Sequence, residues 1–191
     1  MNRMGYLLKS ARYLAAECHR QLLTSGDRVI DATMGNGQDT CSLARLVGEH
    51  GKVIAFDVQG PAVGNTAKLL SEQGLLSRCE LHCLGHEHVL KVVKDPVMLA
   101  VFNLGWLPGG DKSVTTRWET TRMGIDGCLQ LLMAGGVCTI CAYPGHQEGG
   151  RELHELTRWL GAIPPQQFNI LHHRFLNAGP GAPECFILQR Q

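Results

Sequence analysis

Hydrophobic positions recur along the chain in short unbroken runs, and stretches of helical periodicity separate them. The runs cover residues 28–32, 52–56, 79–84, 97–102 and 136–142, and each is apolar along most of its length. A parallel strand that is covered on both faces shows this pattern, whereas a strand with one face in water alternates. The runs therefore predict an α/β fold in which a doubly wound parallel sheet carries helices on both faces.

Both ends of the chain depart from this alternation. Residues 6–23 have apolar side chains at helical spacing and predict an amphipathic helix. Residues 168–173 and 185–189 read as strands, and the Gly- and Pro-containing segment 177–183 between them is too short for a crossover helix. We therefore expect a single domain over 1–191, with an N-terminal helix in 1–24 and a Rossmann-like core in 25–191. Its mostly parallel seven-stranded sheet would end in a C-terminal antiparallel hairpin.

Composition narrows the class of protein. The chain has 191 residues, of which 44% are hydrophobic and 18% charged, which excludes a disordered polyelectrolyte. No apolar run approaches the roughly 20 residues that cross a bilayer, and the N-terminus lacks a secretory signal, so we expect a cytoplasmic protein and no membrane contact. The 8 Cys lie scattered through apolar segments and indicate reduced, buried thiols. A formal charge of +1 neither demands nor excludes a nucleic-acid partner.

The strongest local motif spans residues 29–40, where a strand runs into a glycine turn and a helix begins near Asp39. Gly35 and Gly37 permit positive φ and close approach of the backbone to a ligand over the helix N-terminus. A dinucleotide-binding fingerprint would place a third glycine at the position of Thr40. Asp31 would repel a phosphate but can meet the ammonium of an amino-acid-like ligand. The motif thus favours S-adenosylmethionine over NAD.

Two further strand ends add candidate ligand contacts. Asp57 ends the second strand, where a carboxylate can accept two hydrogen bonds from a ribose diol, and Gln59 follows as a neutral helper. His86, after the third strand, either bonds an adenine edge or faces solvent. The predicted cofactor-binding set is Asp31, Gly35, Asn36, Gly37, Gln38, Asp39, Thr40, Asp57, Gln59, His86 and Asn103.

The fourth strand runs into a loop of unusual composition, from Asn103 through Trp106 to Asp111 and Lys112. Methyltransferases that modify nitrogen on nucleobases commonly carry Asn or Asp here, followed by two prolines and an aromatic residue. The amide oxygen orients the amine and the aromatic face stacks the base. Asn103 and Trp106 are the candidates for these roles.

Four segments together carry a family resemblance: 31–40, 56–59, 102–112 with the threonines at 115 and 116, and 143–146. On these residues the chain resembles the MnmM family, also called YtqB and grouped with rRNA methylases, over nearly its whole length. The resemblance implies a class I methyltransferase fold with S-adenosylmethionine as methyl donor. It also implies transfer to the amino group of 5-aminomethyl-2-thiouridine at the wobble position, with the tRNA anticodon region as partner.

An alkylamine is mostly protonated near neutral pH, and the ammonium form has no lone pair for the methyl group. The enzyme must bind the neutral form or remove a proton. Asn103 would hold the nitrogen, and Asp111, Tyr143 or His146 is the candidate proton acceptor. The choice among the three stays open, since Asp111 also suits a solvated turn and His146 also suits a cap after the fifth strand.

Cations near the predicted site suggest an RNA surface. Lys112, Arg117 and Arg122 lie on or just after the Trp106 loop, and the first helix carries Arg3, Lys9 and Arg12. The alternative for the first-helix set is an ordinary solvated surface. A homodimer is a further prediction.

No metal is expected. Cys138 and Cys141 match one of the two ligand pairs of a zinc site, but on a strand they would point to opposite faces. The cluster of Cys79, His82, Cys83, His86 and His88 lacks a second ligand pair. Competing functions are a methyltransferase for rRNA or a small amine, an NAD-type oxidoreductase, and a non-catalytic RNA-binding module.

Overall fold

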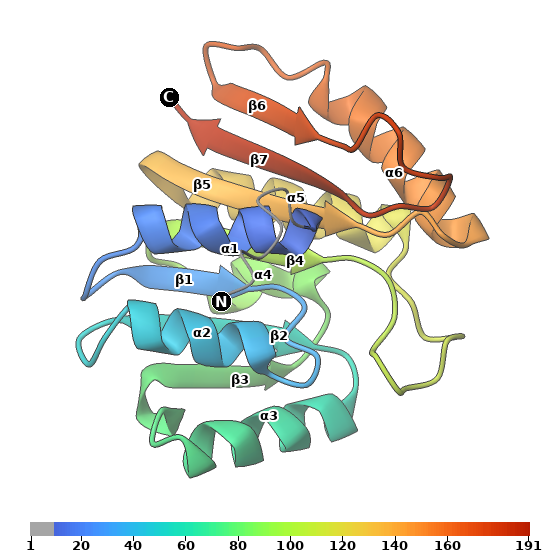
Figure 1. Ribbon diagram of the computed structural model, residues 1–191. Helices are drawn as coiled ribbons and strands as arrows, with labels where there is room; N and C mark the ends of the chain where they lie inside the picture. Colours follow the sequence, from blue (N-terminus) through green and yellow to red (C-terminus); the bar gives the residue numbers. More distant parts are fainter. Residues whose placement is uncertain (1–9) are drawn as a thin grey trace, which may run out of the picture.

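The computed structural model describes residues 10–191 and contains one seven-stranded sheet (Figure 1). The strand order is β3-β2-β1-β4-β5-β7-β6. Only β7 runs against its neighbours, so the predicted hairpin of β6 and β7 is confirmed, with β7 inserted between β5 and β6. The strands are β1 (Arg28–Asp31), β2 (Lys52–Asp57), β3 (Cys79–Cys83), β4 (Val97–Asn103), β5 (Leu132–Ala142), β6 (Phe168–His173) and β7 (Glu184–Arg190).

Helices cover both faces of the sheet, as predicted. One face carries α1 (Ala11–Leu22), α2 (Gln38–Leu46) and α3 (Gly60–Glu72), and the other carries α4 (Val89–Val92), α5 (Trp118–Leu131) and α6 (Gln147–Leu160) (Figure 1). Short 3₁₀ turns, η1 (Leu76–Arg78) and η2 (His86–His88), flank β3. The predicted first helix starts at residue 6, and its residues 6–9, like the cation Arg3, lie outside the described residues.

Two cores explain why the strand sequences do not alternate. Ile30 and Phe56 pack into the core under α4, α5 and α6, whereas their neighbours Val29 and Ala55 pack into the core under α2 and α3. Successive side chains of a strand point to opposite faces, so a sheet buried on both sides needs apolar residues at every position. The unbroken apolar runs thus follow from burial on both faces.

The fifth strand begins earlier than predicted, at Leu132 rather than residue 136. Its pairing with β4 is irregular, because the register shifts between Val97 and Leu99. Gly135 has a φ of 76°, a conformation that glycine adopts without strain. This glycine lets the chain pass the irregularity and remain in the sheet.

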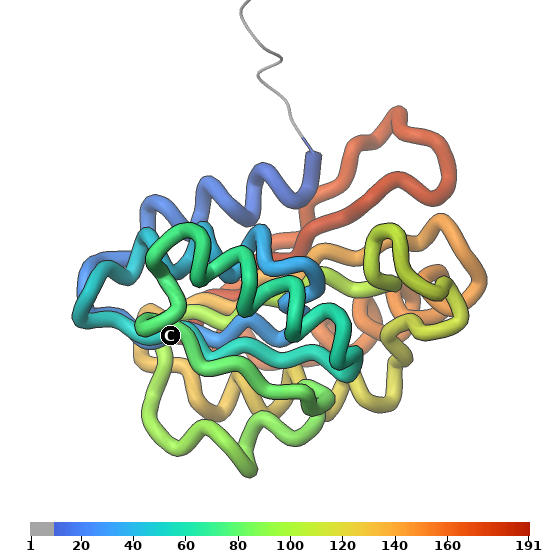
Figure 2. Tube along the Cα trace, turned by 90° about the horizontal axis from the view of Figure 1, so that it is seen from below, coloured from blue at the N-terminus to red at the C-terminus, as the bar shows by residue number. Residues whose placement is uncertain are grey.

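The topology brings the candidate site residues to one edge of the sheet. From β1 the chain moves outward to β2 and β3, and from β4 it moves the other way to β5, so β1 and β4 form the topological switch point. The loops 104–116 and 174–183 lie at the edge to which the parallel strands point (Figure 2). The second of these touches the loop after β5, since a Cβ on Gly181 would lie 3.0 Å from the Cα of Gly145. Ligands of such sheets bind at this edge.

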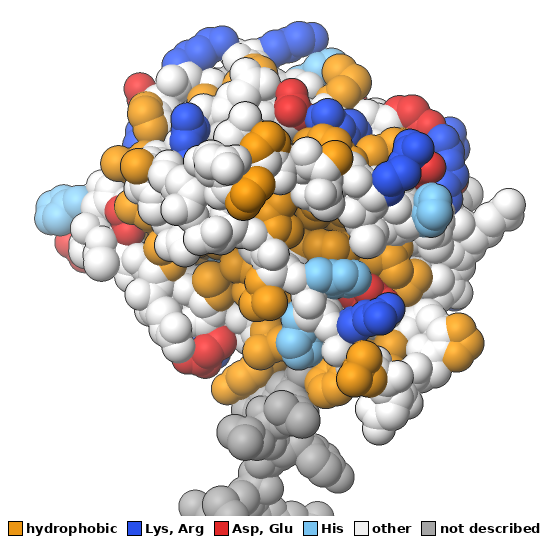
Figure 3. Space-filling model, turned by 90° about the horizontal axis from the view of Figure 1, so that it is seen from above, with side chains coloured by type: hydrophobic (Ala, Val, Ile, Leu, Met, Phe, Trp, Pro, Cys, Tyr) orange, Lys and Arg blue, Asp and Glu red, His pale blue; other side chains and the backbone are white. Residues whose placement is uncertain are grey.

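Other surfaces and side-chain groups bear on the remaining predictions. Figure 3 looks onto the face above β6 in Figure 1, where hydrophobic side chains gather near the middle, and Leu171 on the edge strand β6 is 58% exposed. A homodimer stays a prediction.

All cysteines are free, and five of them are buried. Within residues 10–191, no helix has the length and apolar character to span a bilayer, and no three His, Cys, Asp or Glu side chains converge as metal ligands would.

Candidate active site

The glycine turn after β1 has the backbone geometry that the sequence predicts. Gly35 and Gly37 have φ values of 51° and 82°, and Gly37 is the N-cap of α2. A Cβ at Gly37 would lie 2.8 Å from Oγ1 of Thr66, so a side chain is excluded there. Thr66 on α3 also donates a 2.8 Å hydrogen bond to the carbonyl of Gly35. Helix α3 therefore supports the glycine turn through Thr66.

Asp57, at the end of β2, faces the same turn. Its Oδ2 accepts a hydrogen bond from the Gly35 amide at 3.0 Å, and its Oδ1 accepts one from the Gln59 amide at 2.9 Å. These bonds fix the carboxylate, and each oxygen keeps a second lone pair for another donor. Gln59 contributes its backbone here, as the N-cap of α3. The arrangement suits a carboxylate that accepts from a diol.

Asp31 and Thr40 lie deeper than the sequence predicts. Both are fully buried, and Thr40 Oγ1 donates to Asp31 Oδ2 at 2.7 Å while the Thr33 amide donates to Asp31 Oδ1 at 3.3 Å. Burial raises the pKa of Asp31 to about 7. With no exposed atom, neither side chain reaches a ligand directly in this conformation. They support the turn from inside, and the hydroxyl of Thr40 occupies the place that a dinucleotide fingerprint leaves to glycine.

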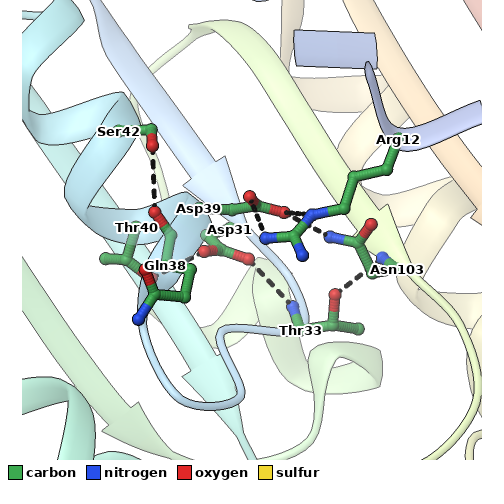
Figure 4. Close-up of polar contacts among 8 residues, drawn as sticks. All are labelled: Arg12, Asp31, Thr33, Gln38, Asp39, Thr40, Ser42 and Asn103. Atoms are coloured by element: carbon green, nitrogen blue, oxygen red, sulfur yellow. Dashed lines mark hydrogen bonds and ion pairs between the residues drawn. The ribbon is translucent and has the colours of Figure 1, made fainter. Parts of the chain in front are cut away.

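Asp39 connects three elements (Figure 4). Its carboxylate pairs with Arg12 of α1, through Nη2 at 2.5 Å and Nε at 3.2 Å, and its Oδ2 accepts from Nδ2 of Asn103 at 2.9 Å. A carboxylate only accepts, so the amide of Asn103 turns its nitrogen toward Asp39 and leaves Oδ1 on the other side. The backbone amide of Asn103 is in turn anchored on Thr33 Oγ1 at 2.7 Å. The amide oxygen of Asn103 is thus oriented at the end of β4.

Arg12, a candidate RNA contact, has a partner within the fold. Its guanidinium pairs with Asp39, and this hydrogen bond is the main cause of its raised pKa, while about half of the side chain, 51%, stays exposed. The partners are 27 residues apart, and no local pattern signals the pair. Arg122 is likewise engaged within the fold, since it lies 3.7 Å from the ring centroid of Trp159 and pairs with Asp126. Lys112 and Arg117 remain exposed.

Trp106 and His146 come together beside the fourth and fifth strand ends. Their ring centroids are 4.4 Å apart, and Nζ of Lys112 lies 5.4 Å from the Trp106 ring. His146 is the N-cap of α6, and its Nδ1 accepts from the Gly149 amide at 3.2 Å. Its Nε2 is buried and has no partner among the described residues. The cap alternative describes His146 correctly, and the ring also supports Trp106.

None of the three candidate proton acceptors combines a free basic atom with a buried position. Asp111 is exposed, and the Ser113 amide, which donates to it at 2.8 Å, lowers its pKa. Burial raises the pKa of Tyr143 to about 12, so its phenol stays protonated at neutral pH. The Nδ1 lone pair of His146 is used by the helix cap. None of these three side chains therefore offers a free base beside Asn103.

The other predicted cofactor residues have varied surroundings. His86 is buried, its Nδ1 lies 3.2 Å from the Ala32 carbonyl, and its Nε2 is enclosed, so contact with adenine would require the ring to leave the core. Burial lowers the pKa of His86. Asn36 accepts from Asn65 and donates to the carbonyl of Pro108. Gln38 is exposed at the start of α2.

These groups fit S-adenosylmethionine better than a phosphorylated ligand. The carboxylates of Asp39 and Asp57 lie beside the turn, and the guanidinium of Arg12 is paired with Asp39. Such an environment repels a pyrophosphate and attracts an ammonium or a sulfonium. The donor set therefore suits a cationic nucleoside.

Known proteins resemble this chain in sequence. Residues 53–189 match the family described as "Putative rRNA methylase". The tRNA (mnm(5)s(2)U34)-methyltransferase, chloroplastic, of Arabidopsis thaliana is 32% identical to this chain, and the match covers 98% of this chain and 73% of that protein.

Solved structures of similar sequence have the same fold. A protein of Clostridium thermocellum with the same family description has a TM-score of 0.95 and 34% identity, covering 97% of this chain and 100% of that one. A methyltransferase of Streptococcus mutans in complex with S-adenosylhomocysteine has a TM-score of 0.88 and 32% identity, with the same coverage of 97% and 100%. The chain therefore belongs to this rRNA methylase family, a family of class I S-adenosylmethionine-dependent methyltransferases.

Proposed function

We propose that the protein transfers the methyl group of S-adenosylmethionine to the amino group of 5-aminomethyl-2-thiouridine at the tRNA wobble position. The observation that carries the proposal is the 32% identity to the Arabidopsis enzyme across 98% of this chain. The oriented amide of Asn103, beside the exposed loop that carries Trp106, supports it. A cytoplasmic location remains part of the proposal.

Asp57 would hold the ribose hydroxyls, and Gly35 and Gly37 would let the backbone approach the cofactor. When bound, the cofactor supplies an electrophilic methyl group. Asp39 keeps negative charge near the start of α2, which favours a cation there. Asp31 and Thr40 contribute by holding the turn.

Asn103 would orient the acceptor. Its Oδ1 accepts an N–H of the substrate amine, while Asp39 and Arg12 prevent the amide from turning over. Holding two reactants in line contributes about 7 to 11 kcal/mol to lowering a barrier. Positioning is therefore the main contribution of these residues.

The amine proton leaves to solvent before the chemical step, because Asp111, Tyr143 and His146 are poor acceptors. At pH 7.4 an amine with a lysine-like pKa of about 10.4 is neutral in about one molecule in a thousand, and selecting that form costs about 4 kcal/mol. This cost is smaller than the contribution expected from positioning. Asn103, as a neutral acceptor, binds the uncharged amine without burying an ion.

The tRNA anticodon would lie over the loop after β4. Trp106 provides a stacking surface for a base, and stacking contributes about 1 to 3 kcal/mol per base. The exposed Lys112 and Arg117 would contact phosphates. Arg12 and Arg122 form ion pairs within the fold, so Lys112 and Arg117 carry most of the proposed phosphate contact.

The test is methyl incorporation from labelled S-adenosylmethionine into tRNA that lacks only the terminal methyl group, followed by identification of the labelled nucleoside. Bulk rRNA and a small primary amine serve as parallel acceptors, and the family description makes rRNA the second candidate. Label in 5-methylaminomethyl-2-thiouridine supports the proposal. Label in rRNA alone, by a protein that binds the cofactor, overturns it.

A thermal-shift comparison of S-adenosylhomocysteine with NAD tests the enzyme class separately. A ligand at 100 times its Kd stabilises the fold by about 2.7 kcal/mol, which shifts the melting temperature measurably. Stabilisation by NAD alone would contradict the family assignment.

A further inference from the structure

Residues 104–116 form a loop, called here the substrate loop, whose two ends are joined by hydrogen bonds. The Gly105 amide donates to Thr116 Oγ1 at 2.7 Å, and the Thr116 amide donates to the Gly105 carbonyl at 3.0 Å. Trp106 and Thr115 add an antiparallel bridge above them. Gly105 has a φ of 112°, which a residue with a side chain would rarely adopt. The loop therefore starts and ends at one closed base.

A buried carboxylate holds this base. Glu152 of α6 is 1% exposed; its Oε2 accepts from Thr116 Oγ1 at 2.7 Å and its Oε1 accepts from Thr121 Oγ1 at 2.6 Å. Both donors are neutral hydroxyls. Burial raises the pKa of Glu152. A buried carboxyl group is costly, so one that accepts from two hydroxyls indicates a need for directional acceptors at this place.

The same helix supports the loop a second time. His146, the N-cap of α6, lies against Trp106, and Glu152 holds Thr116 further along the helix. At the tip, the Pro108 carbonyl accepts from Asn36 at 3.3 Å, and Leu107 Cδ1 would lie 3.2 Å from a Cβ on Gly35. The substrate loop thus contacts α6 at its base and the glycine turn at its tip.

We infer that Glu152 is a positioning residue for methyl transfer: through Thr116 it fixes the base of the substrate loop and so holds Trp106 beside Asn103. The effect on methyl transfer to tRNA rests on the proposed function, whereas the anchoring of the substrate loop by Glu152 does not. Glu152 itself touches neither Asn103 nor Trp106 through any hydrogen bond or ring contact in the described part of the chain. It acts through the hydroxyl of Thr116.

Four variants separate positioning from stability. Glu152→Ala removes both acceptors, and Thr116→Val removes the hydroxyl that links Glu152 to Gly105. Thr121→Val is the matched control, because it removes the other hydroxyl on Glu152 and leaves the bond to Thr116 intact. Glu152→Gln is the conservative variant: its oxygen can accept from Thr116 and its NH₂ can donate to the hydroxyl of Thr121.

The expected pattern concerns kcat/KM for tRNA. Glu152→Ala and Thr116→Val should lower it by about 10- to 100-fold, as for a lost charge-assisted hydrogen bond, with the Kd of S-adenosylhomocysteine changed by less than about twofold. Glu152→Gln and Thr121→Val should stay within about threefold of the parent. Full activity of a folded Glu152→Ala, or equal losses in Thr116→Val and Thr121→Val, overturns the inference.

Hydrogen exchange supplies a readout that needs no substrate. Amides of residues 104–116 should exchange at least about tenfold faster in Thr116→Val than in Thr121→Val. The reason is that losing the Thr116 hydroxyl makes the base of the loop open more easily, and open amides exchange. Equal exchange in the two variants overturns the inference. If exchange changes as expected but no tRNA is methylated by the parent, the substrate assignment fails and the anchoring role of Glu152 stands.

Discussion

The side-chain amide of Asn103 donates a hydrogen bond to Asp39 over 2.9 Å and joins the end of β4 to the first turn of α2. Asp39 also binds Arg12, so its carboxylate cannot rotate without losing an ion pair. The orientation of the Asn103 amide is therefore set by two helices that lie on the same face of the sheet. The predictions for catalysis start from this contact.

Replacing Asn103 by alanine should slow methyl transfer about 100-fold, because the amine loses the acceptor that aligns it. The Kd of S-adenosylmethionine should change by less than about threefold, a difference under about 1 kcal/mol. Single-turnover rates and equilibrium binding measure the two effects. Ser42→Ala, on the same helix as Asp39 and hydrogen-bonded to the Gln38 carbonyl, is the control. Methyl transfer by Asn103→Ala at the parent rate would show that Asn103 does not align the amine.

Asp57→Ala should weaken cofactor binding about 10- to 100-fold, the effect of losing charge-assisted hydrogen bonds to a diol. The same change leaves the Gly35 amide without its acceptor, so the glycine turn also becomes less ordered. Calorimetric titration with S-adenosylhomocysteine measures the loss. Asp126→Ala removes an equal charge from the exposed face of α5 and should leave affinity unaltered. An unchanged Kd in Asp57→Ala would be incompatible with the role given to this carboxylate.

The logarithm of kcat/KM should rise by about one per pH unit between about pH 6.5 and 8.5, since only the neutral amine reacts and its pKa is lysine-like. Tyr143→Phe and Asp111→Asn should keep this slope, because neither side chain is expected to take the proton. Rates at constant ionic strength give the profile. A plateau near pH 7 in the parent, lost in either variant, would identify an enzyme base instead.

His19 makes a separate prediction about stability. It lies on α1 with its Nε2 2.9 Å from Thr139 Oγ1 of β5, and burial lowers its pKa to about 4 from 6.5. Between these values the unfolded chain binds more protons than the folded one, so this histidine costs stability as the pH falls. From pH 7.5 to 5 the loss is about 2 kcal/mol.

Asp31 opposes this effect, because its raised pKa makes the folded state the better proton binder between 3.8 and about 7. The measurement is therefore the difference between the parent and His19→Gln in the free energy of unfolding by urea. The variant should lose about 2 kcal/mol less than the parent on acidification to pH 5. His154→Gln, at an exposed position of α6, should follow the parent. Parallel profiles for parent and His19→Gln would show that His19 does not stay neutral in the fold.

Much of the fold and part of the site can be read from local sequence. Apolar side chains at every position, as in residues 52–56, indicate a strand that is buried on both faces. Gly35 and Gly37 mark a turn that needs positive φ, and Asp57 follows a strand whose end must lie beside that turn. Burial periodicity and backbone conformation act over a few neighbouring residues, so one sequence carries them.

The pairing of side chains was decided by the tertiary structure. Arg12 meets Asp39 across 27 residues and Glu152 meets Thr116 across 36, because the docking of α1 and α6 on the sheet brings them together. Asp31 and Thr40, which the sequence places in contact with the cofactor, are instead buried inside the fold, where the Thr40 hydroxyl donates to Asp31. Such contacts depend on how separate helices pack against the sheet. The periodicity within one segment does not determine that packing.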